Sequence, residues 1–97
     1  MIGVVAVLKV RPGSEQVFEA GFKDLAAKVK ANEPGALTYQ LTKSRTETGT
    51  YKVLELYTSA DALKAHGQTD YFKEAGRSVF ADCMAAPPEV EVLDAVE

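Results

Sequence analysis

The sequence predicts an α+β fold, the ferredoxin-like arrangement in which helices cover one face of a four-stranded antiparallel sheet. The main observation is the order of the predicted elements, β-α-β-β-α-β, which is typical of that arrangement. The strand segments alternate apolar and polar residues or are apolar throughout, whereas the helical segments repeat apolar residues at three- and four-residue steps. A chain of 97 residues has room for one domain, which we expect over residues 1–97.

The first predicted strand, Ile2 to Val10, is apolar on both of its faces. Alternate residues from Ile2 to Val10 point to one face, and Val5 and Val7 point to the other. An antiparallel strand with one wet face should alternate apolar and polar residues instead. Because a chain this short supplies helices for only one face of the sheet, we expect a second subunit to cover the other.

The first helix is predicted from Ser14 to Asn32, after a turn at Arg11-Pro12-Gly13. Ser14 is the expected N-cap. The helix should end before Pro34, because proline disfavours helical backbone in the residue that precedes it. An apolar stripe recurs at helical spacing along this segment and consists of Val17, Phe18, Gly21, Phe22, Leu25 and Val29.

A hairpin should follow, with strands over Ala36 to Lys43 and Tyr51 to Tyr57 and a polar loop over Ser44 to Thr50. Glu55 is unusual in the second of these strands, because its neighbours on the same face are apolar or aromatic. We expect it either to tune a nearby histidine or to pair with a lysine. The hairpin also carries a set of aromatic residues, namely Tyr39, Tyr51 and Tyr57.

The rest of the chain should form two helical segments and a final strand. Ser59 caps a short helix that ends near Gly67, and Thr69 or Asp70 caps a longer one. The fourth strand is expected over Glu89 to Val96. The longer helix has an apolar stripe made of Phe72, Ala75, Gly76, Val79, Phe80, Cys83 and Met84.

Composition narrows the possible partners. The net charge is −3 and acidic and basic residues are interspersed, so no basic stripe exists for phosphate contacts, and we expect no nucleic-acid partner. No apolar run approaches the roughly 20 residues that span a bilayer, and no basic segment precedes the apolar N-terminus, so we expect neither membrane binding nor a signal peptide. Cys83 is the only cysteine and cannot form an intrachain disulfide, which fits a cytoplasmic location.

His66, the only histidine, is the strongest candidate for a catalytic residue. A histidine side chain titrates near neutral pH and suits proton transfer, although His66 could instead cap its helix by bonding a backbone carbonyl. We expect no metal, because one histidine and one distant cysteine fall short of a zinc site. No phosphate-binding or dinucleotide-binding glycine motif is present, and Cys83 is expected to be an inert core residue. The expected substrate-binding residues are Tyr39, Glu55, Tyr57, Phe72 and Phe22.

Three stretches resemble one family. Glu33 to Tyr39 resembles its EPGxxxY entry to the second strand, Glu55 to His66 resembles its ExWxsxxaLxaH segment, and Thr69 to Phe72 resembles the short segment that follows. The chain is thus similar to the antibiotic biosynthesis monooxygenase domain of the dimeric α+β barrel superfamily. Tyr57 stands where the family usually has tryptophan. The chain has no tryptophan, which counts against a haem-degrading role.

The resemblance implies a homodimer whose two sheets pack face to face, with a pocket between each sheet and its own helices. It also implies a cofactor-free oxygenase that acts on quinols or phenolic polyketides, with His66 as the proton acceptor. Two other hypotheses about the function are also consistent with the sequence. One is an isomerase of a small phosphorylated hydroxyketone signal on the same scaffold, and the other is a ligand-binding or stress-responsive dimer without catalysis.

Overall fold

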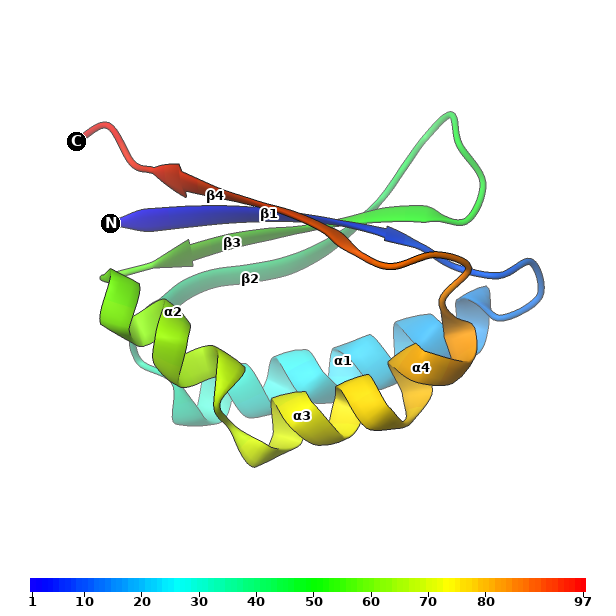
Figure 1. Ribbon diagram of the computed structural model, residues 1–97, viewed down its shortest axis with the longest axis horizontal. Helices are drawn as coiled ribbons and strands as arrows, with labels where there is room; N and C mark the ends of the chain where they lie inside the picture. Colours follow the sequence, from blue (N-terminus) through cyan, green and yellow to red (C-terminus); the bar gives the residue numbers. More distant parts are fainter.

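The four predicted strands form one antiparallel sheet with helices on a single face, which confirms the α+β ferredoxin-like fold (Figure 1). The sheet order is β2-β3-β1-β4, and the computed structural model describes residues 1–97. The strands are β1 (Ile2–Lys9), β2 (Ala36–Lys43), β3 (Thr50–Tyr57) and β4 (Glu89–Asp94). The helices are α1 (Glu15–Asn32), α2 (Ala60–Gly67), α3 (Asp70–Arg77) and α4 (Val79–Cys83).

The central strands set which residues face the helices. β1 pairs with β3 so that Val4 lies opposite Glu55 and Ala6 lies opposite Val53, and these four side chains share the face that the helices cover. Val4, Ala6 and Val53 are buried there. On the opposite face Leu54 remains 42% exposed, because no element of the chain covers that side of the sheet.

Helix α1 buries one apolar stripe against the sheet. Its buried residues are Phe18, Phe22, Leu25 and Val29. Val17 was expected in the same stripe but is 60% exposed, because it lies about 100° around the helix from Phe18. Ser14 stands at the N-cap position without a side-chain hydrogen bond. The carboxylate of Glu15 accepts a hydrogen bond from the Gly13 N–H instead.

The chain between Ser59 and Met84 forms three helices rather than the two expected. The helix predicted from Asp70 onward is interrupted at Ser78, whose φ of −112° and ψ of −98° are not helical. The Ser78 hydroxyl donates to the carbonyl of Glu74, a local bond that competes with helix continuation. The two predicted caps are present, because Ser59 accepts from the Ala62 N–H and Thr69 accepts from the Phe72 N–H.

β4 is an edge strand and ends at Asp94, two residues before the expected Val96. Val90 and Val92 lie opposite Ala6 and Val4 and therefore share the helix-facing side of the sheet. Both remain more than half exposed, so this edge of the layer between sheet and helices is uncovered. No helix has the length and apolar character needed to cross a membrane.

Candidate functional site

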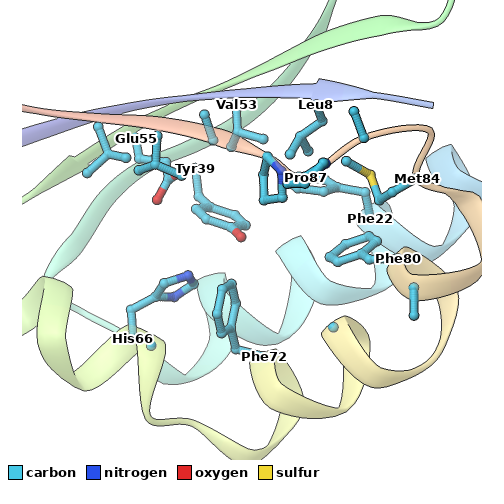
Figure 2. Close-up of a pocket in the computed structure, with 18 of the residues that line it drawn as sticks. Leu8, Phe22, Tyr39, Val53, Glu55, His66, Phe72, Phe80, Met84 and Pro87 are labelled. Atoms are coloured by element: carbon cyan, nitrogen blue, oxygen red, sulfur yellow. The ribbon is translucent and has the colours of Figure 1, made fainter.

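A cavity of about 670 Å³ lies between the sheet and the helices (Figure 2). Its size falls within the range of roughly 300–1,000 Å³ that is usual for small-molecule sites. Most of its wall is apolar or aromatic, including Phe22, Phe72 and Phe80. Polar side chains lie at one end, where His66, Tyr39 and Glu55 come together from α2, β2 and β3. The structure thus has a pocket where the family resemblance implied one.

Five of the six residues expected at the site line this cavity. They are His66, Tyr39, Glu55, Phe72 and Phe22. Tyr57 lies behind the wall and has no exposed surface. Its hydroxyl donates a hydrogen bond of 2.7 Å to Oε1 of Glu55, so it supports a cavity residue from within the core.

His66 is held at the cavity wall by aromatic packing and by one carboxylate. Its ring centroid lies 4.7 Å from that of Phe72 and 5.0 Å from that of Tyr39. Nδ1 lies 3.0 Å from Oε1 of Glu33. The side chain therefore bonds a carboxylate rather than a backbone carbonyl, which contradicts the helix-capping alternative.

Glu33 was not expected at the site, and sequence spacing gave no means of finding it. It follows the last turn of α1 and lies 33 residues before His66 in the chain. Gly35 allows this meeting, because a Cβ there would stand 2.8 Å from the Cβ of Ala62 in α2. The close approach brings α2 against the turn that follows α1. The only available signal was that Glu33 opens one of the stretches that carry the family resemblance.

The second ring nitrogen of His66, Nε2, belongs to a side chain that lines the cavity. Nε2 makes no hydrogen bond, whereas no fully buried polar side-chain atom lacks a hydrogen-bond partner. Nε2 therefore keeps accessible surface, and His66 lines the cavity. In the tautomer with the proton on Nδ1, that nitrogen donates a hydrogen bond to the Glu33 carboxylate. Nε2 is then left with a lone pair that can take a proton from a bound molecule.

Burial shifts the pKa values of the other two polar residues of the cavity, Glu55 and Tyr39. It raises the pKa of the Glu55 carboxyl, although the hydrogen bond from Tyr57 and the nearby His66 act in the opposite direction. Burial also raises the pKa of the Tyr39 phenol, so Tyr39 remains a neutral hydroxyl. Glu55 does not form the expected salt bridge with a lysine such as Lys52 or Lys43, and Lys43 pairs with Glu19 at 3.1 Å. No lysine or arginine lines the cavity.

The remaining candidates belong to the core. Tyr51 is buried against Phe18 and donates a hydrogen bond to Glu19. Cys83 is buried, and burial raises the pKa of its thiol, so it lacks the exposed thiolate that reactive cysteines need. No three histidine, cysteine or acidic side chains lie close enough together to hold a metal ion.

Known proteins resemble this chain in both sequence and fold. The family model for antibiotic biosynthesis monooxygenase matches residues 1–78. A candidate antibiotic biosynthesis monooxygenase from Caulobacter crescentus is 66% identical, with a TM-score of 0.96 over 99% of this chain and 90% of that chain. A conserved protein from Methanosarcina mazei is 25% identical, with a TM-score of 0.88 over 95% of this chain and 89% of that chain. No curated protein matched.

Proposed function

The chain belongs to the antibiotic biosynthesis monooxygenase family, and on that basis we propose that it oxidises a quinol or related phenol with O2 and without a cofactor. One observation carries the proposal. Nδ1 of His66 is held by Glu33, which leaves Nε2 without a hydrogen-bond partner in a side chain that lines an apolar cavity large enough for an aromatic substrate. Such a nitrogen is suited to accept the proton of a substrate hydroxyl.

The proposed chemistry needs no external reductant. His66 removes a proton from one hydroxyl of the quinol, and the resulting phenolate is electron-rich enough to react with O2. A bond forms between a ring carbon and one oxygen atom, and the O–O bond breaks. The quinol supplies all four electrons and loses two hydrogen atoms, so that a hydroxyquinone and one water molecule leave. His66 returns its proton to the departing oxygen.

The cavity wall supports this role in two ways. Its apolar surface excludes water, which strengthens the interaction between the base and the substrate hydroxyl. Its polar end holds neutral hydrogen-bonding groups on Tyr39 and a carboxyl on Glu55, but no cation. A phosphorylated hydroxyketone would bring a phosphate charge into a cavity lined by no lysine or arginine, so the wall favours an uncharged aromatic substrate over the isomerase alternative.

The test is oxygen consumption by the purified protein with a panel of uncharged quinols. We expect O2 uptake at a one-to-one ratio to quinol. With oxygen-18 gas, one labelled atom should enter the product and the other should enter water. Conversion of a phosphorylated hydroxyketone without O2 uptake, or quinol binding without turnover, would contradict the proposal.

A further inference from the structure

We propose that Glu33 is a positioning residue that keeps the proton of the neutral His66 ring on Nδ1, and so keeps Nε2 available as the base. The expected effect of Glu33 on turnover rests on the proposed function. The tautomer of the His66 ring does not depend on any reaction.

Nδ1 of His66 lies against a carboxylate, which only accepts hydrogen bonds when it is ionised. Both carboxylate oxygens of Glu33 lie within hydrogen-bond reach of it, at 3.0 Å and 3.2 Å. In water a neutral imidazole side chain favours the other tautomer, with the proton on Nε2. A ring in that form could not accept a substrate proton at the cavity. The hydrogen bond made by one ring nitrogen decides which nitrogen is protonated, so the Glu33 carboxylate reverses the preference found in water.

Tyr71 also helps to hold the Glu33 carboxylate in place. Its hydroxyl donates a short hydrogen bond to Oε2 of Glu33. Burial and this bond raise the pKa of Tyr71 to about 12, so the phenol remains a donor at neutral pH. One carboxylate thereby joins three parts of the chain, namely the end of α1, α2 through His66 and α3 through Tyr71.

Burial strengthens the interaction between His66 and Glu33. The side chains of His66 and Glu33 are only 4% and 11% exposed, so water screens their interaction weakly. When Nε2 takes a proton, the positive charge forms beside a carboxylate that is already aligned. Glu33 thus orients the neutral base without lining the cavity itself.

The test uses the fact that the protein has a single histidine, so its ring signals need no assignment. Nitrogen-15 NMR of the labelled protein, at a pH where the ring is neutral, reports which nitrogen carries the proton. We expect the proton on Nδ1. In Glu33→Gln the side-chain amide can donate to Nδ1, so we expect the proton to move largely to Nε2. A wild-type ring protonated on Nε2, or a Glu33→Gln ring that keeps its proton on Nδ1, overturns the proposal.

Two further variants separate positioning from general damage. Tyr71→Phe removes the second donor to Glu33 but leaves the carboxylate, so we expect the Nδ1–H tautomer to persist, and its loss would contradict the assignment to Glu33 alone. Glu19→Gln is the matched control, because it also replaces a carboxylate that accepts a tyrosine hydroxyl, that of Tyr51, outside the cavity. It should leave the His66 signals unchanged.

If quinol turnover is found, enzyme kinetics provide a second test of the positioning role of Glu33. Glu33→Gln should lower kcat by about 10- to 100-fold, the range seen when the orienting partner of a metal-bound histidine is removed, with little change in quinol affinity. An unchanged kcat with a shifted tautomer would overturn the positioning role. If no quinol is turned over but the tautomer result holds, the proposed function fails while the assignment of the ring proton stands.

Discussion

At the scale of single residues, His66 carries the proposed chemistry, and its removal is the direct test. His66→Gln keeps a side chain of similar reach that can hydrogen-bond Glu33, but it cannot act as a base. We expect the fold to be retained and quinol turnover to fall by at least about tenfold. This lower limit is smaller than the 10²–10⁴-fold that a general base usually contributes. Steady-state oxygen uptake measures the rate, and circular dichroism checks the fold. Full activity in His66→Gln would make His66 structural.

Glu55 predicts a pH dependence of stability. Burial raises the pKa of its carboxyl in the folded protein above the value in the unfolded chain. The folded state therefore binds the proton more tightly, and the contribution of Glu55 to stability is greatest below the unfolded pKa. That contribution is lost as pH rises through the folded pKa.

The matching variant is Glu55→Gln, which can still accept the hydrogen bond from Tyr57. We expect the free energy of unfolding of the wild type, relative to this variant, to decrease as pH rises above about 4.3, the usual glutamate pKa. Urea unfolding of both proteins between pH 4 and pH 8 measures the difference. A difference that grows with pH would mean that the Glu55 carboxylate is stabilised by the fold, contrary to its burial.

At the scale of elements, the buried stripe of α1 joins the helix to both the core and the cavity. Phe22 is 2% exposed, stacks on Tyr39 with 5.3 Å between ring centroids, and also lines the cavity. We expect Phe22→Ala to lower the free energy of unfolding by about 3–5 kcal/mol, because it removes a buried ring. Val17→Ala on the exposed side of the same helix should change it by no more than about 0.5 kcal/mol. Urea denaturation compares the two, and a cost below about 1 kcal/mol for Phe22→Ala would contradict its role in the core.

At the scale of the whole molecule, the uncovered face of the sheet predicts a homodimer. Val5, Leu54 and Leu93 lie together on that face by strand register, and Leu54 and Leu93 are each 42% exposed. A second copy packed sheet to sheet would bury this surface, and a stable interface needs on the order of 800 Å² from each partner. We expect sedimentation at micromolar concentration to show a dimer.

A charged substitution locates the interface. Leu54→Arg would place a charge on the apolar sheet face of each copy and should produce a monomer that retains its fold. Val17→Arg introduces the same charge on α1, away from the sheet face, and should remain a dimer. A monomeric wild-type protein, or a Leu54→Arg variant that still dimerises, would show that this face is not the interface.

The sequence by itself determined the order of elements and most of the core, because these depend on local periodicity. β2 occupies the predicted Ala36–Lys43, and Phe18, Phe22, Leu25 and Val29 form the buried stripe of α1 as their spacing requires. Tertiary structure decided what spacing along one segment cannot specify. The register of β3 and the packing around it placed Tyr57 behind the cavity wall rather than in it. The close approach at Gly35 brought Glu33 to His66 across 33 residues, because a contact between distant segments depends on how the chain turns between them.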